Sequence, residues 1–185
     1  MITRTHVAAS LLVALLAAGC LSAPDDPGLR VAGVMLPMGS SISNSPPGEP
    51  VALGSLILCL REPGTVTLES VHLVDSRLGL AVDSFAVRPN PFPRGELGIG
   101  SARDTLVALG LHPSGPQVVD SQCPEDDNDE TWTGGYEVVF QVSYPGPVDA
   151  PPEAGSVEVS YTYGESGHGT LAIPYAVRLC PAVCP

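Results

Sequence analysis

The chain has 185 residues and a formal net charge of −12, with 8 Lys+Arg against 20 Asp+Glu, and all eight basic residues are arginine. This acidity argues against binding to nucleic acid, because few side chains could neutralise a row of phosphates, and against docking on an anionic membrane through a basic patch. The 20 Gly and 20 Pro are too many for a helix bundle, and a hydrophobic content of 44% excludes a wholly disordered chain. The length suits one domain.

The N-terminal segment has the pattern of a secretory signal. Arg4 and His6 precede an uncharged, mostly apolar run over residues 7–19, which is too short to cross a bilayer but typical of a signal peptide. Small residues, Ala17-Ala18-Gly19, come directly before Cys20. This pattern resembles the lipobox of bacterial lipoproteins, although leucine is more usual than alanine at the position of Ala17. In that family the cysteine receives a diacylglycerol, and a peptidase then cuts before it.

The resemblance implies a signal peptide at residues 1–19, lipidation of Cys20 and a location outside the cytoplasm, anchored to the cell membrane. The alternative is an ordinary secretory signal with an A-x-A-like cleavage site. An odd number of cysteines in an exported chain leaves one thiol to explain, and acylation of Cys20 would explain it. The four remaining cysteines can form disulfides in an oxidising compartment; they are Cys59, Cys123, Cys180 and Cys184.

Residues 20–28 are predicted to form a tether, because the stretch SAPDDPG is polar, contains proline and has no periodic pattern. Residues 29–185 then form the domain. A second break, GSSISNSPPGEP at 39–50, is predicted to be a loop between the first strand and the main body.

Short apolar runs of strand length recur along the domain. They cover residues 31–36, 51–60, 65–74, 80–87, 105–111, 136–144, 157–163 and 170–179. The run at 51–60 is apolar enough to be buried on both faces for much of its length. In 65–74 the apolar phase shifts by one residue, which predicts a bulge near Glu69 and Ser70. The run at 105–111 is the weakest, since it could also open a short helix.

The last two runs are predicted to form a hairpin through the loop GESGHG at 164–169. Pro174 lies inside the final run and has no N–H, so this strand is expected at a sheet edge or bulged there. About seven strands, joined by Pro/Gly turns, predict an all-β protein, an antiparallel β-sandwich. We expect less than a tenth of the processed chain in α-helix.

The segment LCLREPGTVTLESVHLVDSRLGLAVDSFAV at 58–87 resembles Ig-like modules of secreted bacterial proteins, and most of the chain resembles a lineage of exported proteins of GC-rich bacteria. The resemblance implies an Ig-like sandwich and transfers no catalytic residue. In an Ig-like arrangement, 51–60 is the second strand and Cys59 lies near the same pole as Cys123. Of three possible connectivities, this favours Cys59–Cys123 with Cys180–Cys184. If 51–60 is instead the first strand, Cys59 meets Cys180.

Three short motifs raise the possibility of chemistry. Ser166 in GESGHG has the place of a protease nucleophile, but the surrounding residues that would supply a base and an orienting group are missing, so a hairpin turn is the better interpretation. The C-x3-C spacing of Cys180 and Cys184 would suit a soft metal or redox exchange, but a disulfide fits an exported chain better. Asp126, Asn128 and Glu130 are weak candidates for Ca²⁺ ligands in an acidic run that lacks the glycine and helices of an EF-hand.

Other candidate ligands are dispersed. His72, His112 and His168 share no metal-ligand spacing, which argues against zinc. Trp132 and Tyr136 form one aromatic pair that could pack against a sugar. We therefore predict a non-enzymatic, membrane-anchored surface lipoprotein without a cofactor, whose partner would be an unknown extracytoplasmic protein. The alternatives are an exported module that binds Ca²⁺ or glycan, or a small exported hydrolase.

Overall fold

The computed structural model describes residues 25–32, 38–90, 101–126 and 134–184, apart from the side chains of Ser55, Ser101 and Ala102. These residues form strands, turns and loops without an α-helix, as predicted, and therefore include no helix that could cross a membrane. The strands are β1 (Leu29–Val31), β2 (Met38–Ile42), β3 (Val51–Leu60), β4 (Val66–Val74), β5 (Ala81–Pro89), β6 (Ser101–Ala102), β7 (Gln117–Val119), β8 (Tyr136–Ser143), β9 (Glu153–Ala154), β10 (Ser156–Tyr163), β11 (Gly167–Ile173) and β12 (Tyr175–Leu179).

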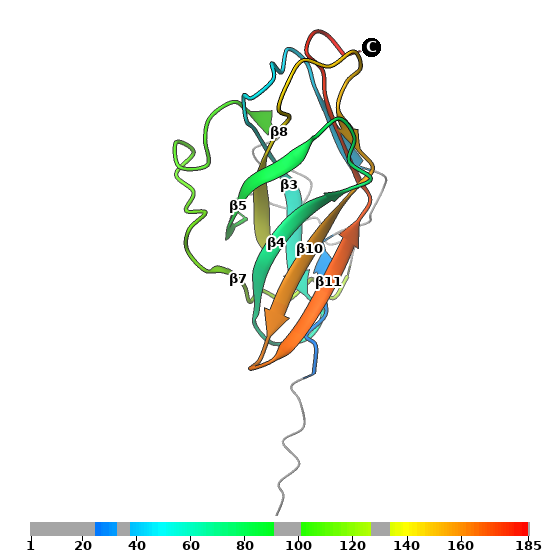
Figure 1. Cartoon of the computed structure of the whole chain (residues 1–185). Helices are drawn as coiled ribbons and strands as arrows, with labels where there is room; N and C mark the ends of the chain where they lie inside the picture. The colour runs from blue at the N-terminus through cyan, green and yellow to red at the C-terminus, as the bar shows by residue number, and fades with distance from the viewer. Residues whose placement is uncertain (1–24, 33–37, 91–100, 127–133, 185) are drawn as a thin grey trace, which may run out of the picture.

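Two sheets form a sandwich. One has the order β1-β3-β8-β5, with β6 added to β3, and the other has the order β11-β10-β4-β7. In Figure 1 the second sheet lies in front of the first. These orders match the A-B-E-D and G-F-C sheets of the immunoglobulin fold, so the predicted Ig-like β-sandwich is confirmed. The described strands number twelve rather than seven, because several are two or three residues long.

The core lies between the two sheets and follows from alternation along the strands. In β3 the inward side chains are Leu53, Leu56, Leu58 and Leu60, and β8 adds Phe140; all of them are fully buried. Facing them, β4 and β10 contribute inward residues that are likewise buried: Val66, Leu68, Val71, Val157, Val159 and Tyr161. Burial of such side chains from both layers is the main source of stability in a sandwich.

The outer face of the β1-β3-β8-β5 sheet is also covered. The segment after β6 turns back over the sheet, where Leu106 and Leu111 pack on Ala52, Ala86 and Val139. The prediction that residues 51–60 are buried on both faces for much of their length is therefore correct. The predicted element at 105–111 is wrong, because these residues form turns rather than a strand or helix. Leu106 and Leu111 are buried because they anchor this loop on the sheet.

Polar groups under this covering segment are paired. Gln117 accepts a hydrogen bond from Val87 N at 2.6 Å and donates to His112 O and Gly115 O at 3.0 and 2.6 Å. Arg88 Nε donates to Oε2 of the fully buried Glu137 at 2.7 Å. Buried polar atoms that are satisfied in this way fix how the segment sits on the sheet.

The bulge and the hairpin were predicted correctly. The β4/β10 register shifts so that Ser160 lies opposite Ser70 and Tyr161 opposite Leu68, which leaves Glu69 as the extra residue. The chain turns between Tyr163 and Gly167 to form the β10/β11 hairpin.

Pro174 divides the last predicted strand between two sheets. Before it, β11 is an edge strand beside β10; after it, β12 is the central strand of a three-stranded sheet, β2-β12-β9. β2 runs parallel to β12, and all but its first residue lie in the region 39–50 that was predicted to be a loop. That prediction is wrong for its first residues, and residues 33–36 of the predicted first strand lie outside the described residues.

The two predicted disulfides are present: Cys59 is bonded to Cys123, and Cys180 to Cys184. They lie at opposite ends of the sandwich. The lower pole, at the bottom of Figure 1, is the end that holds Cys59, the turn after β3 and the β10/β11 turn. The upper pole, at the top, is the end that holds residues 43–48, 75–80, 144–152 and 180–184. The pole assignment behind the predicted pairing is thus correct.

The last residues of the predicted tether pack on the lower pole. Asp26 accepts a hydrogen bond from the Tyr161 hydroxyl at 3.0 Å and one from Gly28 N at 2.8 Å. Pro27 O and Gly28 O accept bonds from the backbone after β3. Burial, followed by the bond to Asp26, raises the pKa of Tyr161 to about 12, so its hydroxyl remains a donor at any physiological pH.

The two disulfides should contribute unequally to stability. In the chain-entropy model, the bridge with a sequence separation of 64 is worth about 4 kcal/mol and the bridge with a separation of 4 about 2 kcal/mol. We expect the Cys59→Ala/Cys123→Ala protein to lose about twice as much unfolding free energy in urea as the Cys180→Ala/Cys184→Ala protein. Equal losses would contradict this order.

The ion pair under the covering segment gives a second prediction. Arg88→Met leaves the carboxylate of Glu137 buried without its guanidinium, and we expect it to lower the free energy of unfolding by about 3 kcal/mol. Adding Glu137→Leu removes the buried charge and should restore most of that loss. Urea denaturation of the two variants measures this, and a double variant less stable than the single one would refute the explanation.

Candidate binding groove at the upper pole

Several predicted site residues lie outside the described residues, namely Cys20, Asn128, Glu130 and Trp132. Asp126 is exposed in the loop after Cys123. The proposed Ca²⁺ site therefore lies mostly outside the described residues, and the structure does not test it. Tyr136, the other half of the aromatic pair, donates its hydroxyl to Asp120 at 2.5 Å. This bond, together with burial, raises the pKa of Tyr136.

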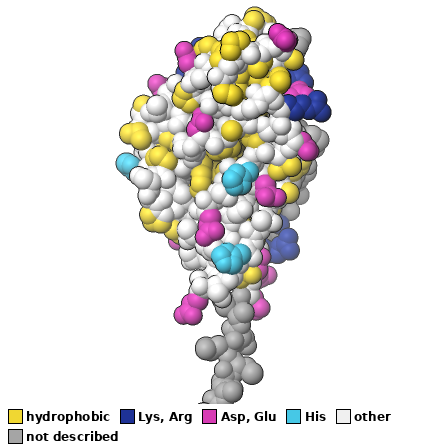
Figure 2. All heavy atoms as spheres, viewed as in Figure 1, with side chains coloured by type: hydrophobic (Ala, Val, Ile, Leu, Met, Phe, Trp, Pro, Cys, Tyr) yellow, Lys and Arg dark blue, Asp and Glu magenta, His cyan; other side chains and the backbone are white. Residues whose placement is uncertain are grey.

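The structure places two of the histidines on neighbouring strands of one sheet. His72 on β4 lies opposite Glu158 of β10, whereas His168 on β11 lies opposite Thr162. Both are exposed on the outer face of the β11-β10-β4-β7 sheet, where Figure 2 shows histidine and acidic side chains among mostly polar atoms. Ser166 is exposed in the hairpin turn. Within the described residues, no three His, Cys, Asp or Glu side chains gather closely enough to hold a metal ion.

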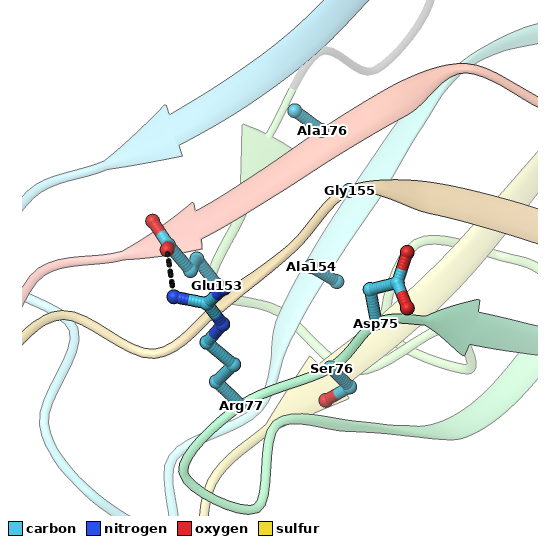
Figure 3. A pocket seen from close by; sticks show the side chains of 7 residues that line it. All are labelled: Asp75, Ser76, Arg77, Glu153, Ala154, Gly155 and Ala176. Atoms are coloured by element: carbon cyan, nitrogen blue, oxygen red, sulfur yellow. Dashed lines mark hydrogen bonds and ion pairs between the residues drawn. The ribbon is translucent and has the colours of Figure 1, made fainter.

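A groove lies at the upper pole, on the exposed side of the β2-β12-β9 sheet (Figure 3). One hollow, of about 630 Å³, is lined by Asp75, Ser76, Arg77, Glu153, Ala154, Gly155 and Ala176. A second, of about 450 Å³, is lined by Met38, Gly39, Ser40, Ser41, Glu153, Ala154, Ala176, Val177 and Arg178. The two hollows share Glu153, Ala154 and Ala176, and together we call them the Glu153 groove.

Backbone contacts fix the walls of the groove. Glu153 is held because β9 pairs with Val177 and Arg178 of β12. Its carbonyl accepts a bond from Arg77 N at 2.9 Å, so the turn after β4 is joined to β9. Asp75 in that turn has φ 55°, a left-handed conformation that non-glycine residues seldom adopt and that Asp tolerates better than most.

The floor of the groove is made of small residues because β2 approaches β12 closely. A Cβ atom on Gly39 would lie 2.7 Å from Ala176 O, so any other residue there would separate the strands. Ala154 and Ala176 complete a floor that leaves backbone within reach of a ligand.

Charged side chains border this floor. The Glu153 carboxylate accepts hydrogen bonds from Arg178 at 2.9 Å and from Arg77 at 3.5 Å, the second of which is drawn in Figure 3. The Arg77 side chain is 74% exposed and that of Arg178 44%. Exposed ion pairs of this kind hold their partners by at most about 1 kcal/mol, so either guanidinium can turn toward a bound polar group. The groove offers recognition by arginine and carboxylate groups, without a nucleophile–base pair among its lining residues.

Sequence reasoning did not find this site. Its residues come from four segments, around positions 39, 76, 153 and 177. The structure brings them together through the parallel β2/β12 pair, the β9/β12 pair and the turn after β4. The nearest signal was the isolated Arg77 and Arg178 in an otherwise acidic chain.

Comparison with known proteins assigns no family: no family model matches the chain, and no curated protein does. Among solved structures, the ASH/PapD-like domain of human CEP192 (PapD-like domain 7) has 13% identity and a TM-score of 0.38 over 97% of this chain and 98% of that chain. A mutant of the enterotoxigenic E. coli CFA/I adhesin CfaE has 6% identity and a TM-score of 0.39, over 85% of this chain and 49% of the adhesin.

The Glu153 groove should tolerate changes to its charges. Because both ion pairs are exposed, we expect Glu153→Gln to alter the free energy of unfolding by less than about 1 kcal/mol. Urea denaturation measures this, with Glu49→Gln, an exposed acid in the loop before β3, as the matched control. A loss above about 2 kcal/mol specific to Glu153→Gln would mean that the carboxylate is structural.

Proposed function

We propose that this protein is an exported, lipid-anchored surface protein that acts as a non-enzymatic binding module. The observation that carries the proposal is the use of the cysteines. The disulfides consume Cys59, Cys123, Cys180 and Cys184, and Cys20, after three small residues, is the only cysteine left. Disulfides are typical of extracytoplasmic proteins, and a cysteine kept out of them at the end of an apolar N-terminal run is the residue that a lipoprotein modifies.

The geometry of the N-terminal end supports an anchored domain. Among the described residues, Asp26 is the first whose side chain is hydrogen-bonded to the lower pole. Five residues separate it from Cys20, and so short a chain spans at most about 20 Å when extended. A lipid on Cys20 would therefore hold the lower pole near the bilayer.

The position of the groove supports a binding role. The Glu153 groove follows the end of β4, whereas Asp26 lies beside the opposite end of the paired strand β10. An anchored molecule would thus present the groove and the upper-pole loops away from the membrane, toward a partner. The partner we propose is an extracytoplasmic protein whose polar groups match the arginines and carboxylates of the groove.

Lipidation can be tested in a bacterium that processes lipoproteins. A clickable fatty-acid analogue fed to the cells should label the wild-type protein and fail to label Cys20→Ala. The Cys20→Ala protein should also leave the membrane fraction, since the acyl chains supply about 0.8 kcal/mol of membrane affinity for each buried CH₂ group.

The control is a variant that keeps Cys20 but lacks another cysteine pair, Cys180→Ala/Cys184→Ala. It should be labelled as strongly as wild type. Equal labelling of Cys20→Ala and wild type would overturn the lipid anchor, and secretion of an unlabelled wild-type protein would point to an ordinary signal peptide.

A further inference from the structure

The β11 strand presents a long edge to the outside of the molecule. All seven of its residues pair with β10 in a continuous register, and no other described strand pairs with it. Every second peptide group along its outer side therefore directs its N–H and C=O away from the sheet. At about 3.3 Å per residue the edge is roughly 23 Å long.

The other sheet edges are short or carry features that discourage pairing. β1 and β7 have three residues each, and β5 contains Asp83 and ends in Pro89. β11 has the sequence GHGTLAI, which contains neither an Asp, Glu, Lys or Arg nor a proline. Short strands, charges, bulges and prolines are the means by which proteins protect an edge, and β11 uses none of them along its length.

The inner side of this edge is formed by tyrosine rings. A Cβ atom on Gly169 would lie 2.4 Å from the ring of Tyr161, and one on Gly167 would lie 2.2 Å from the ring of Tyr163. The two rings therefore occupy the space of the missing side chains, and the glycine backbone lies bare beside them. Tyr161 is buried and its hydroxyl is bonded to Asp26. The inward side chains of an added strand would therefore meet the half-buried Tyr163 and Leu171.

Acidic side chains predominate on β10, on β11 and in the turn between them, although Arg30 lies on β1, which contacts β11. Neither β10 nor β11 contains an arginine. Glu158 lies on β10, opposite Ala172, the exposed Glu165 lies in the hairpin turn, and Asp26 is bonded to the Tyr161 hydroxyl. The whole chain has a net charge of −12 and no lysine, so the complementary ligand is a basic one.

We propose that the β11 edge binds an extended segment of a partner protein, with alternating apolar and polar side chains and with basic residues at its ends. Backbone hydrogen bonds to β11 would supply the affinity, and contacts with Tyr163, Leu171 and the flanking carboxylates would supply the selectivity. A second copy of this chain is the other conceivable occupant. A second copy would also carry a net charge of −12, so the two chains would repel each other. Antiparallel pairing of two β11 strands would also direct the two lower poles in opposite directions.

The test uses two synthetic peptides and the oxidised Cys20→Ala protein. The probe is Lys-Val-Thr-Val-Thr-Val-Lys, and its matched control is Glu-Val-Thr-Val-Thr-Val-Glu. Titration followed by amide chemical shifts should show saturable changes in β11 and β10, with the lysine peptide binding at least tenfold more tightly than the glutamate peptide. Raising the salt concentration should weaken the binding of the lysine peptide, because the flanking charges are exposed and salt screens them.

Two variants test the electrostatic part without touching the β11 backbone. The combined variant Glu158→Gln/Glu165→Gln should lower the affinity for the lysine peptide by threefold or more. The variant Glu49→Gln, near the upper pole, should leave this affinity unchanged. Absence of shifts at millimolar peptide, shifts centred on another strand, or equal affinity for both peptides would overturn the proposal. Sedimentation showing a dimer with its interface at β11 would overturn it in favour of a second copy.

Discussion

Burial of β3 and β8 on both faces is the constraint on which the rest of the fold depends. Their inward side chains form the core between the sheets, while Ala52 and Val139 on the outer side form the second cluster with Leu106 and Leu111. A sheet so apolar on both sides needs cover on both sides. The segment after β6 covers the outer side at Ala52, Ala86 and Val139. Gln117 and Glu137 are buried as well, and their polar groups have partners.

The described residues place no such cover over the outer face of β4, β10 and β11, and these strands alternate accordingly. In β10 the residues Val157, Val159 and Tyr161 face the core, and the residues between them are half-buried. The molecule thus has one face closed by its own chain and one face of small polar, histidine and acidic side chains (Figure 2). The β11 edge borders the open face, so a partner strand there would extend it.

Features with a local cause could be predicted from the sequence. The bulge at Glu69 follows from a shift in apolar phase within one strand, and the hairpin after Tyr163 from a Gly-rich turn. β2 could not be predicted, because MGSSI has almost no strand pattern and forms through its parallel pairing with β12. The Glu153 groove escaped prediction for a similar reason, since its walls are distant in sequence and meet through the β2/β12 and β9/β12 pairings and the bond from Arg77 N to Glu153 O. The apolar run that suggested an element at 105–111 belongs instead to a loop, in which Leu106 and Leu111 pack on the outer side of the β1-β3-β8-β5 sheet.

The pairing of the terminal strands has a mechanical consequence. β1 runs from the lower pole toward the upper one and pairs antiparallel with Leu58–Leu60, so tension applied at residue 25 along the long axis slides β1 past β3 and does not peel it away. Farther along, β2 lies parallel to β12, and opposite pulls on the two ends of the chain also slide these strands past one another. Hydrogen bonds across such strands share a sliding load and break together, whereas a peeling load breaks them one at a time. The domain is therefore arranged to resist force along the direction that joins its N-terminal end to its upper pole.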